Sequence, residues 1–152
     1  MADTVRFELV SPERLLLSED VHMVVVPGGE GNFGVLPGHA LLISTVRPGI
    51  IDVYKASRVS ERIFVSGGFA EVTPERCTVL ADEAMPLSAL NRAEIEESLK
   101  AVDATIASIE DRVARLQGVE LEQAQAELRL ARARRTLAEA KRGALEGAGS
   151  AH

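Results

Sequence analysis

Hydrophobic residues in the first half of the chain, residues 4–84, recur at every second position or in short runs. Val5, Phe7 and Leu9 alternate with Arg6 and Glu8, so one side of this segment faces a core and the other faces water. Turn-forming pairs separate the runs: Ser11-Pro12, Pro27-Gly28, Pro37-Gly38, Pro48-Gly49, Gly67-Gly68 and Thr73-Pro74. Short strands at this spacing, without helices between them, predict a β-sandwich or a flattened barrel; we expect a β-sandwich of about ten strands over residues 1–86.

A different pattern begins after Met85-Pro86, because residues 88–147 contain no Pro and are rich in Ala, Glu, Arg and Leu. Asn91 and Glu94 form a capping box near the start of this segment. The hydrophobic positions that follow are spaced by four and three in alternation: Ile95, Leu99, Val102, Ile106, Ile109, Val113 and Leu116. This period predicts a first helix over residues 91–117, with Gly118 at its end.

The segment after Gly118 is predicted to be a second helix that starts with the acidic run 120–122. It carries two stripes of small residues, one made by Leu121, Ala124, Leu128 and Ala131, the other by Ala126, Leu130, Ala133, Leu137, Ala140 and Ala144. Small residues let helices approach closely, which favours an antiparallel hairpin over residues 87–147, followed by a disordered tail at 148–152. The predicted fold class is therefore α+β. A two-helix hairpin has little interior, so we expect it to pack against the sandwich, another protein, or each in turn.

The composition of the chain narrows the classes of function. There is no Trp, one Tyr and four Phe, and the net charge is −6, which argues against binding to nucleic acid or to an anionic membrane. Cys77 is the single cysteine, so no intramolecular disulfide can form and a reducing compartment fits. The first residues do not have the pattern of a signal or transit peptide, and no stretch reaches the ~18 apolar residues of a membrane span. We therefore expect a cytoplasmic location, or a peripheral one facing the cytoplasm.

Residues with catalytic chemistry are few and scattered. His22, His39 and His152 lie far apart in the sequence, and no Cys or His has the spacing of metal ligands. Cys77 sits in an alternating strand, which indicates a buried structural thiol more than a nucleophile. A binding or mechanical role is therefore favoured over an independent active site.

The Gly-rich run of residues 27–39 contains the letters of a dinucleotide-binding fingerprint, Gly29-x-Gly31-x-x-Gly34. That chemistry requires the glycines to lead into a helix whose N-terminus holds a pyrophosphate. Pro37 would break the first turn of such a helix, so we interpret the run as a tight exposed loop. A nucleotide-dependent enzyme that uses these glycines is the enzyme-class alternative, and a cofactor titration would test it.

Four motifs, in order along the chain, resemble the epsilon subunit of bacterial F-type ATP synthases: residues 28–40, 47–49, 65–72 and 79–84. The resemblance extends to the sandwich-then-hairpin layout. It implies a non-catalytic rotor subunit of the central stalk, whose sandwich binds the gamma subunit and stands on the c-ring. Such a subunit couples hydrogen ion transport through the ring to ATP synthesis in the catalytic head. It would be a peripheral protein at the cytoplasmic face of the inner membrane, held there through the complex alone.

The resemblance also implies particular contact residues. The c-ring would be met by Glu30, Gly31 and Asn32. These residues offer a negative charge and a backbone that can closely approach the polar loops of the ring. The alternative is a plain hairpin turn. The gamma subunit would be met by His39, Ser44 and Ser66. For His39, a hydrogen bond to local backbone is an equal alternative.

The hairpin of the resembling family is a regulatory element that, in some members, extends along gamma and blocks ATP hydrolysis. In that extended state, basic residues meet an acidic segment of the beta subunit, within the alpha/beta catalytic head. The second helix here carries six cations that fit this role: Arg129, Arg132, Arg134, Arg135, Lys141 and Arg142. A solvated charged face that complements the helix dipole is the alternative reading.

Some members of the family bind ATP through an Asp followed, after a short gap, by Arg-Ala at the start of the first helix. This chain keeps Arg92-Ala93 but has Ser88 where the Asp would stand, and a neutral hydroxyl is a weaker acceptor than a carboxylate. Arg92 is thus a doubtful nucleotide ligand, and no cofactor is expected. A free-standing adaptor with two binding modules remains the alternative function; co-purification with a membrane ATPase would distinguish the two.

Overall fold

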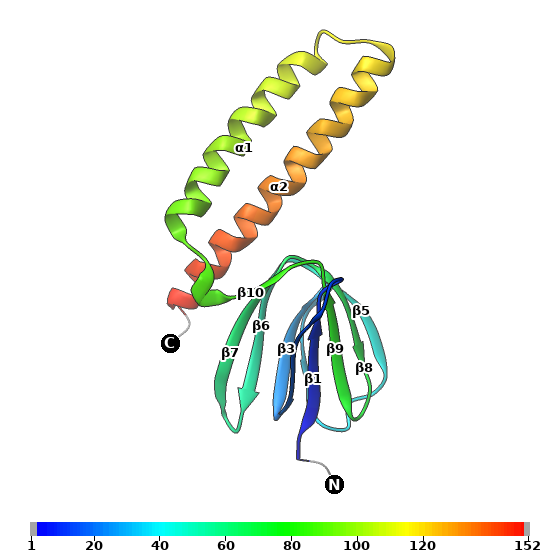
Figure 1. Cartoon of the computed structure of the whole chain (residues 1–152), viewed down its shortest axis with the longest axis vertical. Helices are drawn as coiled ribbons and strands as arrows, with labels where there is room; N and C mark the ends of the chain where they lie inside the picture. The colour runs from blue at the N-terminus through cyan, green and yellow to red at the C-terminus, as the bar shows by residue number, and fades with distance from the viewer. Residues whose placement is uncertain (1–2, 151–152) are drawn as a thin grey trace. The chain divides into compact units, whose positions relative to one another are not determined.

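The computed structural model describes residues 3–150, which form two compact units that divide between Ala89 and Leu90 (Figure 1). The first unit is built of strands and the second of helices, as the change of hydrophobic period predicts. The division lies three residues beyond the predicted boundary, because a short 3₁₀ helix, η1 (Leu87–Ala89), packs on strand β7 and so belongs with the strands.

The described part of the first unit contains ten strands. They are β1 (Val5–Val10), β2 (Leu15–Val21), β3 (Met23–Gly28), β4 (Gly31–Val35), β5 (Leu42–Val46), β6 (Gly49–Lys55), β7 (Arg58–Val65), β8 (Gly68–Val72), β9 (Arg76–Ala81) and β10 (Ala84–Pro86). Their hydrogen-bonded order is β10-β7-β6-β3-β5-β8-β9-β1-β2, and β4 pairs with β3. Neighbours are antiparallel except β1 and β9, which run parallel.

Strand β3 divides this sheet into the two layers of a sandwich. Its residues Met23, Val24 and Val25 pair with β6, whereas Gly28 pairs with Val46 of β5. One layer therefore continues through β6, β7 and β10, and the other through β5, β8, β9, β1 and β2. This confirms the predicted β-sandwich.

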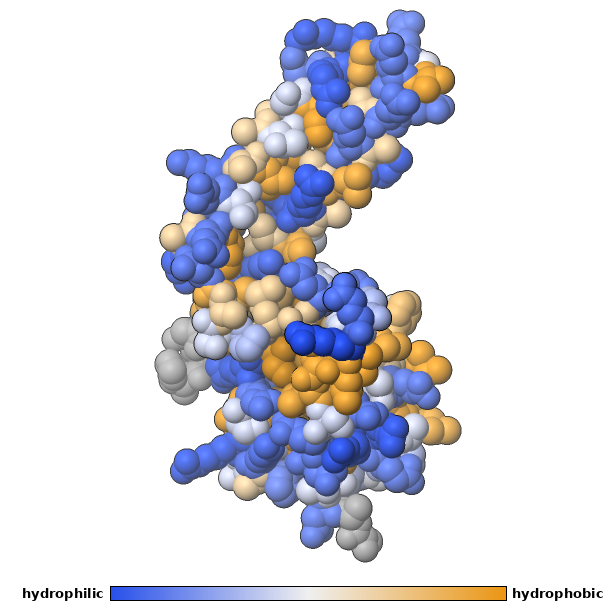
Figure 2. All heavy atoms as spheres, in the orientation of Figure 1, coloured by the Kyte–Doolittle hydropathy of each residue, from blue (hydrophilic) through white to orange (hydrophobic). Residues whose placement is uncertain are grey.

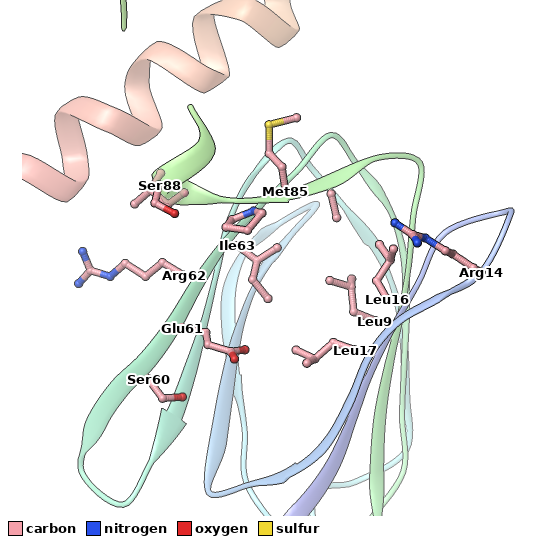
Figure 3. A pocket seen from close by; sticks show the side chains of 13 residues that line it. Leu9, Arg14, Leu16, Leu17, Ser60, Glu61, Arg62, Ile63, Met85 and Ser88 are labelled. Atoms are coloured by element: carbon pink, nitrogen blue, oxygen red, sulfur yellow. The ribbon is translucent and has the colours of Figure 1, made fainter. Parts of the chain in front are cut away.

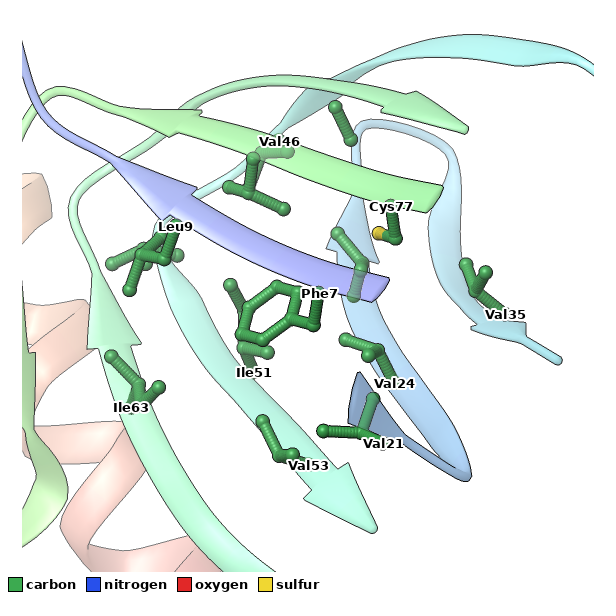
Figure 4. Packing of buried hydrophobic residues seen from close by; sticks show 14 of the residues in the cluster. Phe7, Leu9, Val21, Val24, Val35, Val46, Ile51, Val53, Ile63 and Cys77 are labelled. Carbon is green, nitrogen blue, oxygen red and sulfur yellow. The ribbon is translucent and has the colours of Figure 1, made fainter. Parts of the chain in front are cut away.

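The core lies between the layers and consists of inward-facing residues at alternate positions. Phe7 of β1 and Ile51 and Val53 of β6 are fully buried, and Figure 4 shows their side chains in the same interior. Burying each such side chain contributes about 1.5–3 kcal/mol. Cys77 lies in this core, and burial raises the pKa of its thiol to about 12, so the group stays protonated and packs as a small apolar side chain. The predicted structural thiol is thus confirmed.

The second unit consists of two antiparallel helices, α1 (Arg92–Val113) and α2 (Gly118–Ser150). The side chain of Asn91 accepts a hydrogen bond from the Glu94 backbone N–H at 3.1 Å, as the predicted N-cap requires. Buried contacts between the helices are made by the predicted stripe of α1 and the first stripe of α2, namely Val102, Ile109, Leu128 and Ala131. The second stripe of α2 is less covered, since Leu130 is 62% exposed.

Both predicted helix ends differ from the structure. Helix α1 ends at Val113 and not at residue 117, because the last turn tightens: Arg115 N–H donates to the Arg112 carbonyl and Leu116 N–H to the Val113 carbonyl. Gly118, whose φ is +63°, begins α2 and does not cap α1.

The prediction of a disordered tail at residues 148–152 is also corrected, since α2 continues to Ser150. A helix that has already formed can be extended by further residues without a new nucleation step. Residues 151–152 of that tail lie outside the described residues.

We expect Phe7→Ala to lower the free energy of unfolding of the sandwich by about 3–5 kcal/mol, because the ring is fully buried and its removal leaves a cavity. Chemical denaturation monitored by circular dichroism measures this change. Leu36→Ala, at a position 54% exposed, is the control and should shift stability by less than about 0.5 kcal/mol. Equal effects of the two substitutions would contradict the assignment of the core.

Candidate interaction surfaces

The turn between β3 and β4 presents Glu30, Gly31 and Asn32 to solvent at one end of the sandwich. Gly28 and Gly31 pair across the turn, so only residues 29 and 30 lie outside the ladder. Gly31 has a φ of +137°, which side-chain-bearing residues rarely adopt. At Gly28, a Cβ would lie 2.8 Å from the Phe33 ring, so that ring can cover the backbone only because the side chain is absent.

The glycines of the dinucleotide fingerprint do not lead into a helix. Gly31 and Gly34 are both residues of strand β4, and the segment after β4 is a loop that leads to β5. A phosphate site of that type needs the N–H groups of a helix N-terminus at this point. The run does not lead into a helix, as expected from Pro37, but it was interpreted as one exposed loop, whereas most of residues 27–35 belong to the paired strands β3 and β4.

A hollow of about 470 Å³ lies beside this turn. It is lined by two groups of residues, from the turn with β4 and from β5: Glu30, Gly31, Asn32, Phe33, Leu42, Ile43, Ser44 and Thr45. Ser44, which was predicted to contact the gamma subunit, thus lies next to the turn residues that were predicted to contact the c-ring. The Ser44 hydroxyl donates to the Thr45 carbonyl at 2.8 Å.

The structure does not bring His39 and Ser66 together with Ser44. His39 lies in the loop before β5, where Nδ1 donates to the Ala40 carbonyl at 2.7 Å, the local bond given above as its alternative role. Ser66 lies just before β8, and its backbone N–H donates to the Glu83 carbonyl at 2.9 Å. Because Leu42 pairs with Val72 and Val46 with Gly68, the two residues flank opposite ends of the β5–β8 pair.

A row of exposed hydrophobic residues crosses the outer face of the β5, β8, β9, β1 and β2 layer. Phe69 is 57% exposed and pairs with Leu80, which is 53% exposed and pairs with Val10. Val10 in turn pairs with Leu15, which is 54% exposed. We call these four residues the outer row; Figure 2 shows hydrophobic residues gathered over β8, β9 and β1.

The outer row was not predicted, although the sequence contains its signal. Alternation in β9 places Cys77, Val79 and Ala81 inward, so Leu80 must face outward, and the same argument applies to Phe69 between Gly68 and Ala70. Large apolar residues on the polar face of a strand are unusual for a face that stays in water.

In the described part of the hairpin, α1 and α2 are joined by a ladder of ion pairs. The pairs are Arg92–Glu146, Glu96–Arg142, Asp103–Arg135, Glu110–Arg132 and Arg112–Glu127. From each of the first three pairs to the next, the residue number rises by four and then by seven along α1 and falls by the same amounts along α2. This is the register of two antiparallel helices. The side chains are about half-exposed, so each pair contributes about 0.2–1 kcal/mol.

The ladder engages three of the six predicted inhibitory cations: Arg132, Arg135 and Arg142. The Arg135 Nε to Asp103 Oδ1 distance is 2.6 Å, and the Arg132 Nη2 to Glu110 Oε2 distance is 3.2 Å. Arg129 and Arg134 form no ion pair among residues 3–150. Lys141 belongs to the same predicted set and lies on α2.

Arg92, the doubtful nucleotide ligand, also takes part in the ladder. Its Nη1 lies 3.8 Å from Glu146 Oε1, so the guanidinium already faces a carboxylate. Ser88 belongs to η1 and lines a second hollow of about 630 Å³ in the first unit (Figure 3).

That second hollow lies between β2 and β7, with β10 and η1 beside them. Figure 3 shows Leu9, Leu16, Leu17 and Ile63 lining it, with Glu61 at its side. Burial and then the charge of Glu19 raise the pKa of the Glu61 carboxyl. The lining includes no His or Cys, so it offers no metal ligand of these types and no thiol nucleophile.

The described histidine side chains do not come together in a catalytic arrangement. His22 Nδ1 accepts a hydrogen bond from the Ala56 backbone N–H at 2.8 Å, and His152 lies outside the described residues. Among residues 3–150, no three His, Cys, Asp or Glu side chains are grouped so that they could hold a metal ion. Neither of the two described helices is long and apolar enough to cross a membrane.

Comparison with known proteins gives consistent matches. Residues 4–87 match the family model of the ATP synthase delta/epsilon chain β-sandwich domain. The ATP synthase epsilon chain of Rhodospirillum rubrum is 53% identical over 126 residues, which cover 83% of this chain and 92% of that one.

Two solved structures share the fold. A chain of the Euglena gracilis mitochondrial ATP synthase, in a structure of OSCP, F1 and c-ring, superposes with a TM-score of 0.73 at 20% identity, covering 95% of this chain and 83% of that one. A chain of the Tetrahymena thermophila mitochondrial ATP synthase, in a structure of its central stalk and c-ring, gives a TM-score of 0.52 at 13% identity, covering 86% and 96%.

We expect the interhelical ladder to make the stability of the hairpin depend on salt. Replacing Glu96, Asp103 and Glu110 together by Gln, Asn and Gln removes three of the pairs. At low ionic strength the triple variant should lose about 0.6–3 kcal/mol of helix stability, and in 1 M salt most of this difference should vanish. Thermal unfolding of the helical signal at both salt concentrations measures it. Asp111→Asn is the control, because it removes only the pair between Asp111 of α1 and Arg115, two residues beyond the end of that helix.

Proposed function

The chain belongs to the family of ATP synthase epsilon chains, which are non-catalytic subunits of the central stalk, and from this we propose that its sandwich couples rotation of the c-ring to the gamma subunit. The observation that carries the proposal is the pairing of a polar turn at one end of the sandwich with an apolar outer row on its side. The 53% identity to a bacterial relative supports a place on the cytoplasmic face of a bacterial inner membrane, held there through the complex.

The turn of Glu30, Gly31 and Asn32 is the proposed contact with the c-ring. All three residues are exposed, and the turn has a single carboxylate, so it can approach polar loops closely and accept hydrogen bonds from them. The backbone around it is fixed by strand pairing on both sides, which suits a contact that must transmit torque.

The outer row is the proposed centre of the contact with gamma. An apolar surface that crosses several strands gains most when it is covered by a partner. The predicted residues His39 and Ser66 flank the two ends of the β5–β8 pair, so a partner that covers the outer row along β8 can reach both. Ser44 lies in the hollow beside the turn, where the gamma contact and the ring contact would adjoin.

The hairpin is proposed to be a brake on ATP hydrolysis that works by exchanging ion pairs. For Arg132, Arg135 and Arg142 to meet carboxylates of the beta subunit, their pairs with Glu110, Asp103 and Glu96 must first break. Arg129 and Arg134 need no such exchange, so they would make the first contact. Lys141, on the same helix, belongs to the same proposed contact with the beta subunit. Nucleotide binding is not part of the proposal, since Ser88 lacks a carboxylate and Arg92 faces Glu146.

We expect deletion of residues 90–152 to raise ATP hydrolysis by the assembled enzyme several-fold while coupling is kept. The first unit includes η1, so the cut falls at the boundary between the units. Hydrolysis and proton pumping are measured on the same preparation. Unchanged hydrolysis would exclude the brake and leave the sandwich as the functional part. Loss of coupling would instead contradict the division of roles between the two units.

We expect Phe69→Ser and Leu80→Ser each to weaken binding to gamma by roughly 30-fold in Kd, equivalent to about 2 kcal/mol, if the outer row is the centre of the interface. Titration calorimetry with purified gamma measures this. Leu36→Ser is the control, because Leu36 is equally exposed but lies in the loop after β4. If all three variants bound alike, gamma would have to bind elsewhere.

A further inference from the structure

Arg47 lies directly after β5 and bonds to both strands of the β3–β4 hairpin. Its Nε donates to the Gly28 carbonyl at 3.0 Å, and its Nη2 donates to Asn32 Oδ1 at 2.5 Å. Its backbone N–H donates to the Pro27 carbonyl at 2.9 Å. Because Pro27 pairs with Asn32 across the ladder, one residue holds the base of the turn from two sides.

The guanidinium suits this role because its donors are fixed in one plane. Two hydrogen bonds from one such group set a distance and an angle between the atoms that accept them. A lysine ammonium in its place would keep the charge but not the fork. The turn needs such support, since Gly28, Gly29 and Gly31 give the backbone more freedom than other residues would.

The bond to Asn32 also fixes which way its amide points. Because Oδ1 accepts from Arg47, the Nδ2 group with its two hydrogens is directed elsewhere. Within residues 3–150 neither this Nδ2 nor the exposed carboxylate of Glu30 has a hydrogen-bond or ion-pair partner. The tip of the turn thus offers two donors on Asn32 and an acceptor on Glu30.

We propose that Arg47 is the positioning residue of the turn: it orients Asn32 so that its amide N–H groups donate to a carbonyl of a polar loop in the rotor ring, beside Glu30, which accepts from a donor of that loop. This inference rests on the proposed ring contact of the turn. It goes beyond that contact in naming the residue that sets its geometry and the chemistry of the loop that it fits.

The experiment uses the assembled enzyme with full-length variants, and measures protons pumped per ATP hydrolysed. Arg47→Ala should lower this ratio several-fold, and Arg47→Lys should recover part of it. The melting temperature of the subunit and its Kd for gamma should change little, which separates positioning from a structural role. Arg58→Ala is the control, because Arg58 is also an exposed arginine beside a two-residue turn but its side chain makes no hydrogen bond or ion pair among the described residues.

Asn32→Asp tests the amide without altering Arg47. Aspartate still accepts from Arg47 but has no N–H to donate, so it should lower the ratio as Arg47→Ala does, and the double variant should be no worse than either. If Asn32→Ala lowers the ratio but Asn32→Asp and Arg47→Ala both behave as Arg58→Ala does, the positioning role is wrong and the ring contact stands. If neither Glu30→Gln nor Asn32→Ala changes the ratio, the ring contact itself is wrong.

Discussion

Strand β3 is the element on which the rest of the sandwich depends, because it hydrogen-bonds to both layers. Its first residues pair with β6 and its last residue with β5, while β4 occupies its other edge. The turn that we propose to meet the rotor ring follows the residue at which β3 reaches the second layer. A displacement of β3 would therefore disturb the core, both layers and the turn together, which ties the exposed residues to the most buried part of the unit.

Strands β8 and β9 use both of their faces. Ala70, Val72, Cys77 and Val79 complete the core, and Phe69 and Leu80 lie on the other side of the same strands. Since the inward residues fix the register, the outward residues cannot shift relative to one another. The rigid core therefore gives the outer row a fixed shape. A partner that binds the outer row does not incur the entropy cost of ordering it.

The sequence predicted the fold well because the hydrophobic period is a local signal. Alternation at Val5, Phe7 and Leu9 and the three-four spacing from Ile95 onward each depend on a few neighbouring residues. The interhelical ladder was not predictable in the same way. Its register depends on where α1 ends, and the tightened last turn moved that end four residues from its predicted position.

The candidate contact surfaces could be predicted only in part, because they depend on which strands pair, and the hydrophobic pattern does not specify strand pairing. The exposed turn at Glu30 could be placed from its glycines, but the separation of His39, Ser44 and Ser66 follows from how β5 pairs with β8. Likewise, Arg47 stands in a motif that the sequence singled out, yet its bond to Asn32 joins residues that are neighbours only in the folded chain.

The parallel pairing of β1 with β9 has a consequence for how a newly made chain folds. Leu9 pairs with Val79, and the Thr78 hydroxyl reaches Glu8 across a separation of 70 residues. During synthesis the first strand therefore has only β2 as a neighbour until nearly the whole sandwich has left the ribosome. Closing so long a loop slows folding, whereas a helical hairpin with local contacts folds quickly. The helices are made after the sandwich, yet they can finish folding before it.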